Sequence, residues 1–546
     1  MSCDEYEVIV IGGGITGAGI ARDCAMRGLK TLLLEKKDFS AGTTGTCMGM
    51  LHGGVRYMAT EPEVTKLSCI ESGIIQRLAP HLIFRIPWIM PLFAGGTAAL
   101  KGFASAIAQY DELGKFKNSK SHVVLSAEEA RALEPSLSPN IEGAVTMDEP
   151  GVDVFRLVIA NVISAAEHGA DIRTHARATA ILRDDNQVYG VQITDTLTGE
   201  VEEYHATYVV NAAGPWTPQV ATLARVPFKL RPTKGIHIIF DRRITSTAVS
   251  GAGASLLPHE NTSICGLTDK FFFLDPDEVR SSREEVEYLL SAMEKAIPSI
   301  REARVIRTMA GVRPLLDQPG TDERKLTRHY KVHDHEELDG VRGFLTIAGG
   351  KMVIYRIMAE DMTNLICQKL GRAEPCRTKE EPLPGGEEQV DPAALADGFG
   401  VPLHTVTRIV YRHGSRATRI LEMCREEPQY KSHVCVCEPV TEAEIRYAIT
   451  REWARTLDDL RRRTRLGMGP CQGCHCTKVA AGVLVDERDE PAKRGHQEVS
   501  DFLQERWKGR EPVLVGTQLR QEELLRACYV GVGGYHNPAL EKVSQR

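Results

Sequence analysis

The chain contains 546 residues, of which 42% are hydrophobic and 26% are charged, and its formal net charge is −6. This length is too great for one ordinary core, so we expect two to four globular domains, and the acidic balance gives no reason to expect a nucleic-acid partner. Fourteen cysteines occur behind a chain start without a visible secretory signal, which favours a reducing, cytoplasmic environment and thiolate chemistry over disulfides.

The first predicted element is a dinucleotide-binding turn. The apolar run 7–11 predicts a buried strand, which leads into a G-x-G-x-x-G pattern at Gly12, Gly14 and Gly17. Gly12 permits the tight turn, Gly14 lets a pyrophosphate approach the backbone, and Gly17 lets the following helix, predicted over 16–27, pack closely on the strand.

A second predicted strand, 29–34, ends at Glu35. A carboxylate at this place binds ribose hydroxyls and disfavours a 2′-phosphate. The complete strand–turn–helix–strand–acid pattern predicts a dinucleotide site, but it does not by itself distinguish FAD from NAD. We expect the contacts in this part of the chain to come from Gly12, Gly14, Ile15, Thr16, Gly17 and Glu35.

The longest uncharged apolar stretch covers residues 86–100. It contains Pro87 and Pro91 and is shorter than the ~20 residues that a membrane span needs. We therefore expect buried structure and no membrane span, with contact to a membrane surface or a partner as the alternative.

Two later strands each end in a turn of small residues. The stretch 178–211 predicts a three-strand meander that breaks at Gly214, and the strand 344–349 is followed by Gly350, Lys351 and a predicted helix. Backbone N–H groups at such a helix start suit the electron-rich pyrimidine end of a reduced flavin, and Lys351 adds a positive charge there.

Together these elements resemble the large family of glutathione-reductase-like, and more narrowly D-amino-acid-oxidase-like, FAD oxidoreductases. The resemblance implies an α/β fold: a Rossmann-like FAD domain, discontinuous in sequence, with an antiparallel β substrate domain. It also implies further FAD contacts from Thr44, His52, Gly53, Gly214, Gly349, Gly350 and Lys351.

The segment 43–57 narrows the resemblance, because its His-Gly-Gly-x-Arg-Tyr core at 52–57 looks like the flavin-dependent glycerol-3-phosphate dehydrogenases. Further matching phrases lie at 234–237, 310–315 and 349–356, and at 150–157, where Val154 replaces a proline common in the family.

This resemblance implies a phosphorylated substrate. Guanidinium and ammonium groups bind phosphate oxygens, and Arg56, Arg313 and Lys351 would supply them, with a phenolic hydrogen bond from Tyr57. Oxidising a secondary alcohol also needs a base for the hydroxyl proton, for which His237 is the best candidate. Outside matched phrases, a lone arginine is usually a surface charge and a lone histidine is usually structural.

Five cysteines cluster late in the chain. Cys435 and Cys437 are followed by Cys471, Cys474 and Cys476, and thiolates gathered in this way usually hold a soft metal or an iron–sulfur cluster. The segment resembles the bacterioferritin-associated-ferredoxin-like [2Fe–2S] domain, although Cys₄ also suits zinc. The resemblance implies Cys435, Cys437 and Cys471 as ligands, with Cys476 favoured over Cys474 as the fourth.

A polar stretch rich in Pro and Gly at 378–388 predicts a domain boundary. The short basic run 461–465 is expected to be a solvated helix face, with a docking surface for an acidic partner as the alternative. The expected domains are 1–375 for the FAD-dependent oxidoreductase, with its substrate domain at roughly 216–335, 376–430 for a linker and helical cap, 431–485 for the cysteine module, and 486–546 for a tail that contacts a partner.

Flavin domain plus cysteine module resembles the catalytic subunits of the anaerobic, multi-subunit members of the glycerol-3-phosphate dehydrogenase family. The resemblance implies oxidation of sn-glycerol 3-phosphate to dihydroxyacetone phosphate by hydride transfer to FAD. Electrons would pass through the [2Fe–2S] centre to a second flavoprotein subunit, a membrane-anchoring iron–sulfur subunit and the quinone pool, at the inner face of the cell membrane. Two alternatives stay open: a related dehydrogenase for a hydroxy acid, proline or an opine, and a non-catalytic electron-transfer subunit.

Overall fold

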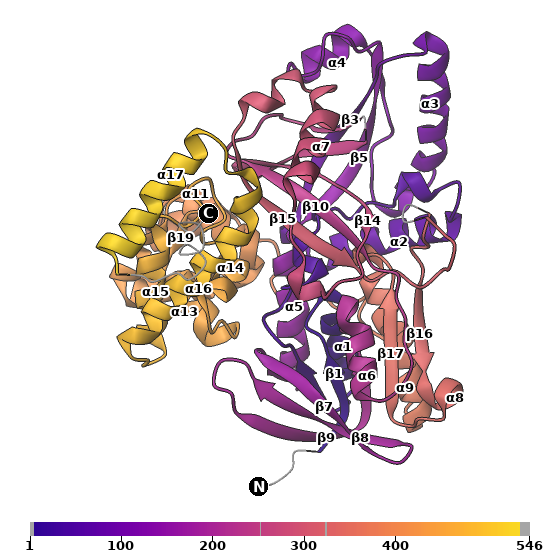
Figure 1. Cartoon of the computed structure of the whole chain (residues 1–546), viewed down its shortest axis with the longest axis vertical. Helices are drawn as coiled ribbons and strands as arrows, with labels where there is room; N and C mark the ends of the chain where they lie inside the picture. The colour runs from indigo at the N-terminus through magenta and orange to yellow at the C-terminus, as the bar shows by residue number, and fades with distance from the viewer. Residues whose placement is uncertain (1–4, 252, 323–324, 535–546) are drawn as a thin grey trace.

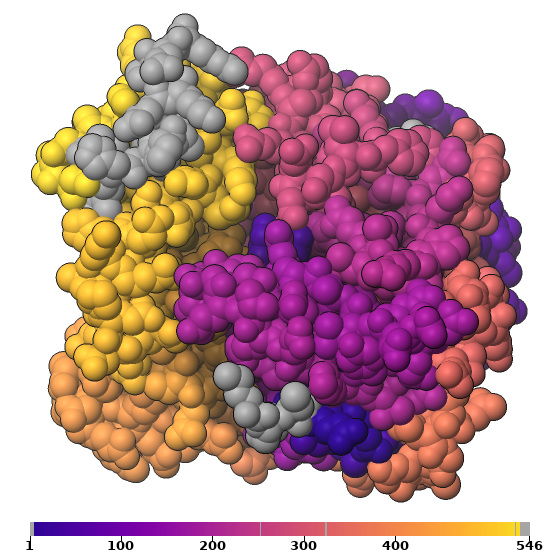
Figure 2. Space-filling model, turned by 60° about the horizontal axis from the view of Figure 1, so that its bottom comes forward, coloured from indigo at the N-terminus to yellow at the C-terminus, as the bar shows by residue number. Residues whose placement is uncertain are grey.

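The computed structural model describes residues 5–251, 253–322 and 325–534. These residues form two sheets, one above the other in Figure 1, and a helical C-terminal lobe, residues 376–534, beside them. Figure 2 shows the yellow and orange surface of this lobe next to the magenta part of the surface. No helix in the described ranges is long and apolar enough to cross a membrane.

The first sheet has a parallel core. β1 (Glu5–Ile11) pairs in parallel with β2 (Thr31–Leu34) on one side and with β9 (Val201–Asn211) on the other, and β17 (Phe344–Gly349) continues in parallel beyond β9. Burial on both faces explains why β1, β2 and β17 read as nearly unbroken apolar runs. The carboxyl ends of these four strands meet at one edge, where open α/β sheets bind their ligands.

The predicted meander extends this sheet. β7 (Ala176–Asp184) pairs antiparallel with β8 (Gln187–Asp195), which pairs antiparallel with β9. β6 (Asp171–Arg173) adds in parallel beyond β2, and β16 (Tyr330–Asp334) adds antiparallel beyond β17. The edge strands therefore frame the parallel core that carries the glycine turn.

Three helices cover one face of the first sheet. α1 (Ile15–Met26) packs between α5 (Val154–Glu167) and α9 (Tyr355–Leu370). Every residue of α1 except Thr16 is buried, so this helix lacks the polar face of a surface helix. The helix predicted over 16–27 is thus present, and Gly28 follows it in the left-handed conformation that ends helices.

The second sheet is assembled from two separate parts of the chain. β15 (Val305–Arg313) lies antiparallel along β10 over its whole length. The sequence placed the substrate domain at roughly 216–335, and the structure adds strands from residues 83–152 to the same sheet. In spatial order the other strands are β14 (Lys270–Phe271), β10 (Thr233–Phe240), β13 (Thr262–Gly266), β12 (Ala254–His259), β11 (Ala248–Gly251), β3 (Ile83–Leu92), β5 (Gly143–Val152) and β4 (Val124–Ser126).

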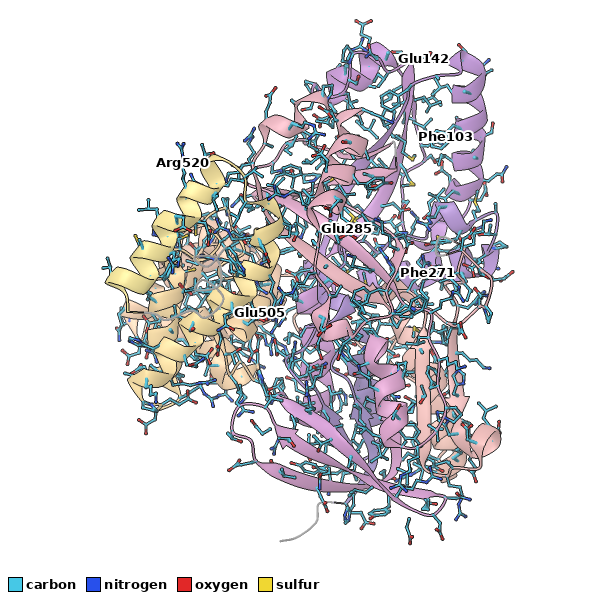
Figure 3. The ribbon with its side chains drawn as sticks, viewed as in Figure 1. Phe103, Glu142, Phe271, Glu285, Glu505 and Arg520 are labelled. Atoms are coloured by element: carbon cyan, nitrogen blue, oxygen red, sulfur yellow. The ribbon has the colours of Figure 1, made fainter. Side chains whose placement is uncertain are left out.

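The apolar stretch 86–100 forms β3 and the beginning of α3 (Gly96–Asp111). Ile86, Trp88, Ile89 and Met90 are buried, whereas residues 94–98 are exposed. Pairing with β5 along all of β3 explains the burial, because both strands lie inside the second sheet. Figure 3 shows Phe103 on α3 and Phe271 at the end of β14, on the side of the molecule away from the C-terminal lobe.

The C-terminal lobe contains two small cores. One core joins the helices of its first part to α13, and the other lies around the cysteine segment and the last helices. A two-stranded sheet of β18 (His433–Cys435) and β19 (Val440–Thr441) connects the two parts. The main helices are α10 (Pro392–Phe399), α11 (Leu403–His413), α12 (Ala417–Glu426), α13 (Glu442–Arg451), α14 (Leu457–Thr464), α15 (Cys476–Glu487), α16 (Ala492–Arg510) and α17 (Thr517–Arg526).

The basic run on α14 is not a solvated face, so that expectation was wrong. Arg462, Arg463 and Arg465 are 7%, 0% and 6% exposed. The cause is a set of buried carboxylates that the sequence places far away, among them Asp38, to which both Arg462 and Arg463 bind. α14 therefore docks on the first sheet domain of the same chain.

The end of the described chain also packs on the rest of the molecule. α16 lies against β15, where Thr308 Oγ1 donates a hydrogen bond of 3.0 Å to the Gly509 carbonyl. The predicted contact between the tail, residues 486–546, and a partner would therefore involve only the tail surface that does not pack on β15. Residues 535–546 of this tail lie outside the described residues.

Candidate functional site

One continuous cavity of about 1550 Å³ links the two sheets and the C-terminal lobe. It begins at the glycine turn after β1, passes Lys351 and His237, and reaches Arg465 and Met468 of the C-terminal lobe. Pockets for a single small ligand usually measure ~300–1,000 Å³, so this cavity has room for a dinucleotide and a substrate together.

Most of the residues predicted for the site line this cavity. Gly17, Gly53 and the clustered cysteines are not among the residues that line it. The predicted residues that line it are Gly12, Gly14, Ile15, Thr16, Glu35, Thr44, His52, Arg56, Tyr57, Gly214, His237, Arg313, Gly349, Gly350 and Lys351.

The glycine turn is built so that no side chain fits in it. Gly12 has a φ of +120°, and a Cβ added there would lie 2.5 Å from the Ala212 carbonyl oxygen. A Cβ on Gly17 would lie 1.9 Å from the Gly12 carbonyl oxygen. The turn therefore keeps side chains out of the space beside its backbone, so that a pyrophosphate can approach closely.

Glu35 stands at the end of β2 with its carboxylate held in place. Its Oε2 accepts the Gly13 N–H at 2.7 Å and its Oε1 accepts the Lys37 N–H at 2.8 Å. Burial raises the pKa of this carboxyl, and the two backbone donors oppose that shift. Thr44 lies across the turn, where its Oγ1 accepts the Ile15 N–H at 3.2 Å. These residues fit the adenosine and pyrophosphate part of FAD.

Lys351 fastens the His-Gly-Gly turn. Its Nζ donates hydrogen bonds to the carbonyl oxygens of His52 (3.3 Å) and Gly53 (2.9 Å) and to Ser68 Oγ (3.0 Å). Burial lowers the pKa of Lys351 to about 7, against the opposing effect of Glu149. Burial and the charge of Lys351 also lower the pKa of His52, so the imidazole of His52 is neutral.

Glu149 is a buried carboxylate that lines the same cavity. Neither Glu149 nor its two partners were predicted from the sequence. Its Oε1 accepts from the Tyr110 hydroxyl at 2.6 Å and its Oε2 pairs with Lys117 Nζ at 2.7 Å. All three side chains are at most 1% exposed. Tyr110 and Lys117 lie 39 and 32 positions before Glu149, so no local pattern in the sequence indicates this contact.

Two arginines share one carboxylate near the substrate end of the cavity. Arg313 donates to Asp269 Oδ1 at 3.1 Å, and Arg328 Nη2 lies 3.5 Å from Asp269 Oδ2. Arg328 Nε also donates to the Tyr57 hydroxyl at 3.0 Å, while its buried Nη1 has no hydrogen-bond partner. Arg56 lies over the Tyr57 ring, 4.7 Å from the ring centroid.

Arg328 and Asp269 were missed by the sequence reasoning. Both lie outside the matched phrases, in segments without a glycine pattern. Their side chains lie 59 positions apart in the sequence and meet only in the folded chain, where Arg328 also contacts Tyr57. The result is a buried, cationic corner whose charge exceeds that of its single shared carboxylate, and such a corner suits an anionic group.

His237 faces the same cavity from β10. It is 4% exposed, and both ring nitrogens lack a hydrogen-bond partner. Burial, with a smaller contribution from Arg313, lowers the pKa of His237 to about 3. The imidazole is therefore neutral at neutral pH, with a ring nitrogen able to accept a proton.

Four of the five clustered cysteines influence one another. Hydrogen bonding with Cys476 lowers the pKa of Cys435 to about 6. Burial raises the pKa of Cys437 to about 11, and Cys471 contributes to that shift. Cys474 differs, because its sulfur lies 3.8 Å from Arg506 Nη1. Thiols grouped in this way fit a soft metal or a cluster by their chemistry, but no set of three or more His, Cys, Asp or Glu side chains in the described ranges has the geometry of a metal site.

The cysteine segment touches the second sheet directly. Asn261, in the turn between β12 and β13, donates a hydrogen bond of 3.1 Å to the Cys437 carbonyl. In the same region Arg465 Nε pairs with Glu438 at 3.1 Å, and Arg465 Nη2 lies 3.5 Å from His259 Nδ1. His259 and Arg465 both line the cavity, which thus reaches the neighbourhood of the cysteines.

Comparison with known proteins agrees with this geometry. Residues 7–356 match the family described as "FAD dependent oxidoreductase", and residues 376–490 match "C-terminal domain of alpha-glycerophosphate oxidase". The FAD-bound glycerol-3-phosphate dehydrogenase structure from Bacillus halodurans has a TM-score of 0.75, with 24% identity over 94% of this chain and 97% of that one. This likeness confirms the predicted fold class, and the family match confirms FAD as the cofactor.

Two relatives are closer in sequence. A subunit of the anaerobic glycerol-3-phosphate dehydrogenase of Escherichia coli (strain K12) is 38% identical over 537 residues, which are 97% of each chain. The aerobic glycerol-3-phosphate dehydrogenase of Staphylococcus aureus (strain USA300) is 32% identical over 465 residues, which are 79% of this chain and 81% of that one. The chain therefore belongs to the FAD-dependent oxidoreductases, and within them to the family of the glycerol-3-phosphate dehydrogenases.

Proposed function

We propose that this chain oxidises sn-glycerol 3-phosphate to dihydroxyacetone phosphate. The observation that carries the proposal is the cationic corner, in which Arg313 and Arg328 share Asp269 and the buried Arg328 Nη1 has no partner. A substrate phosphate would supply the missing acceptors, because a guanidinium can bind phosphate oxygens through two N–H groups at once. The names of the relatives agree with this substrate.

The remaining residues then take distinct roles. Tyr57 and Arg56 complete the phosphate corner, and Lys351 holds the His-Gly-Gly turn that faces the flavin. His237 is the candidate base for the proton of the substrate hydroxyl, because it lines the cavity and has both ring nitrogens unpaired, although a pKa of about 3 makes its imidazole a weaker base than that of an exposed histidine. Bound FAD supplies the hydride acceptor.

We propose that Cys435, Cys437, Cys471 and Cys476 hold a [2Fe–2S] cluster, which would supply a one-electron carrier. The mutual influence of these thiols supports this set. The position of Cys474 beside Arg506 argues against Cys474 as a ligand. Zinc is the alternative occupant, and iron analysis of the purified protein distinguishes the two.

Partners and location are also part of this proposal. Some relatives are named as one subunit of an anaerobic glycerol-3-phosphate dehydrogenase, and such a name implies further subunits. We propose a second flavoprotein subunit and a membrane-anchoring iron–sulfur subunit that passes electrons to the quinone pool. The chain would then work on the cytoplasmic side, peripheral to the membrane. The domain boundaries at 376, 431 and 486 belong to this proposal.

Anaerobic mixing of the FAD-loaded protein with glycerol 3-phosphate tests the activity. We expect rapid loss of the oxidised-flavin absorbance, and no loss with glycerol or with proline. The appearance of a reduced-cluster EPR signal afterwards would support the electron route. Absence of bleaching with FAD demonstrably bound would contradict the proposal and favour a subunit that only transfers electrons.

A further inference from the structure

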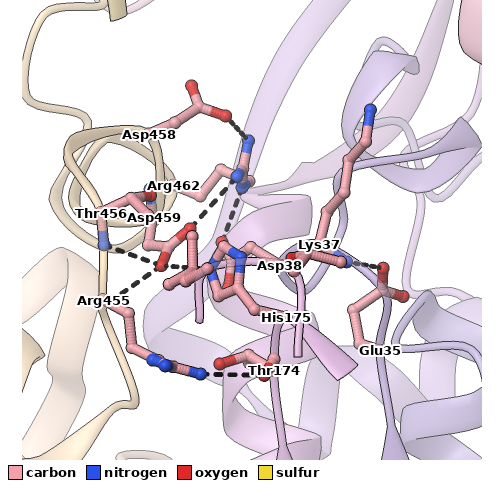
Figure 4. Close-up of polar contacts among 12 residues, drawn as sticks. Glu35, Lys37, Asp38, Thr174, His175, Arg455, Thr456, Asp458, Asp459 and Arg462 are labelled. Atoms are coloured by element: carbon pink, nitrogen blue, oxygen red, sulfur yellow. Dashed lines mark hydrogen bonds and ion pairs between the residues drawn. The ribbon is translucent and has the colours of Figure 1, made fainter. Parts of the chain in front are cut away.

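Helix α14 of the C-terminal lobe forms part of the wall of the cofactor cavity. Thr456, Asp458, Asp459, Arg461 and Arg462 all line the cavity whose other wall is the glycine turn. Figure 4 shows the start of this helix facing the loop that begins at Glu35 and the segment that contains His175. A helix expected from the sequence to be a solvated surface thus borders the adenosine end of the FAD site.

The first link between α14 and this loop is a pair of arginines on one carboxylate. Asp38 is fully buried, and its Oδ2 accepts from Arg462 Nε at 2.7 Å and from Arg463 Nη1 at 2.8 Å. Arg463 Nη2 binds Asp38 Oδ1 at 2.6 Å, which makes this pair bidentate. Asp38 lies three residues after Glu35, so the arginines fix the end of the ribose-binding loop.

The second link holds a residue in a rare backbone conformation. His175 has a φ of +57°, which a non-glycine residue adopts only at a cost. Its Nε2 lies 3.0 Å from Asp459 Oδ2, and its N–H donates to the Lys37 carbonyl at 2.7 Å. The next residue, Ala176, donates its N–H to the Glu35 carbonyl at 2.8 Å. Asp459 therefore holds His175 in place at the start of β7, and the backbone of His175 and Ala176 in turn binds the loop that contains Glu35 and Lys37.

We propose that α14 is part of the FAD site and that FAD and the C-terminal lobe bind the flavin domain cooperatively. Asp38 and Asp459 act as positioning residues, because their carboxylates bind the α14 arginines and His175 and so fix the loop around Glu35. Binding free energies are reciprocal, so a docked α14 tightens FAD and bound FAD tightens the docking of α14. The inference concerns FAD alone and does not depend on the substrate or on a metal cluster.

The first test measures FAD release from the full-length holoenzyme. Asp38→Asn and Asp459→Asn remove one side of each link, and we expect FAD to leave at least tenfold faster, measured by the return of free-flavin fluorescence after dilution. Glu260→Gln is the matched control, because it removes an ion pair between the lobe (Arg408) and the turn after β12 in the second sheet and leaves both links to the Glu35 loop intact. Wild-type release rates in both variants, or equal acceleration in the control, would overturn the proposal.

A second test needs no variant. Hydrogen exchange of the wild-type protein is measured with FAD and after FAD removal, comparing α14 with α11 of the same lobe. We expect the amides of α14 to exchange faster without FAD, while those of α11 change little. Equal protection of α14 in both states would contradict the coupling even if every variant failed to fold.

Discussion

Arg328 carries a charge that its neighbours compensate only in part. It shares Asp269 with Arg313 and donates one N–H to Tyr57, and its remaining buried nitrogen is unsatisfied. An unsatisfied buried donor costs roughly 1–3 kcal/mol, more when charged, so a ligand that satisfies it gains that free energy on binding. The same atoms that destabilise the empty site thus favour an anionic substrate.

Arg328→Met should therefore weaken the substrate and leave the cofactor in place. Loss of one partner of a buried charged contact costs about 2–5 kcal/mol, so we expect kcat/KM for glycerol 3-phosphate to fall by at least about thirtyfold. Steady-state kinetics together with the flavin-to-protein ratio measure both quantities. Arg242→Met, at an exposed arginine beside Asp241, is the control, and an equal effect there would contradict the role of Arg328.

Lys351 predicts an alkaline limit of activity. Its pKa of about 7 means that the ammonium is charged below pH 7 and loses its proton as the pH rises above it. Deprotonation weakens the hydrogen bonds to His52, Gly53 and Ser68 and removes a positive charge beside the site. We expect kcat/KM to fall between about pH 7 and pH 9, and the pH profile of Lys351→Met to lack this limb. His237, with a pKa of about 3, should add no limb in this range.

The strand pair β10–β15 places several site residues on one face of the second sheet, because every second side chain of a strand points to the same side. Arg313 and Gly311 face the cavity side of β15, and Gly235 on β10 leaves the space that the Arg313 guanidinium occupies. His237 follows two residues later on the same face of β10. The register of this strand pair thus sets the distance between the phosphate corner and the base.

The glycine turn between β1 and α1 gives a sharper test of an element. Gly17→Ala would place a Cβ 1.9 Å from the Gly12 carbonyl oxygen, and backbone atoms there cannot give way cheaply. We expect the variant to be purified with little or no FAD, measured by the absorbance ratio at the flavin and protein bands. Gly102→Ala on α3 has open space around its Cβ and should keep full FAD loading.

We expect opposite results from substitutions of the two neighbouring cysteines Cys474 and Cys476. Cys476→Ser should lose the iron and the EPR signal of the reduced protein, because Cys476 groups with Cys435. Cys474→Ser should keep both, because its sulfur faces Arg506. The reverse result would assign Cys474 as the ligand, and equal zinc in all samples would replace the cluster by a zinc site.

Much of the whole molecule could be predicted from the sequence, for a physical reason. The strand–turn–helix at Gly12 and the meander at 178–211 depend on local patterns, and both are present in the structure. The first sheet could be placed because its central strands are buried on both faces and read as apolar runs.

What could not be predicted depends on side chains brought together from distant parts of the chain. Arg328, Asp269 and Glu149 carry no local signal, and the arginines of α14 read as solvated because their partner Asp38 lies more than 400 residues away. For the same reason the second sheet was predicted from 216–335 alone, although β3 and β5 belong to it.

The interleaving of the two sheets has a consequence for biosynthesis. β1 is made first, but its neighbour β9 follows about 200 residues later, β17 beyond β9 follows about 340 residues later, and α14 is complete only at residue 464. A growing chain on the ribosome thus carries an unfinished cofactor site for most of its synthesis. Sheets that depend on such distant pairings form slowly and expose strand edges while they wait. We therefore expect FAD to bind only after most of the chain has been synthesised.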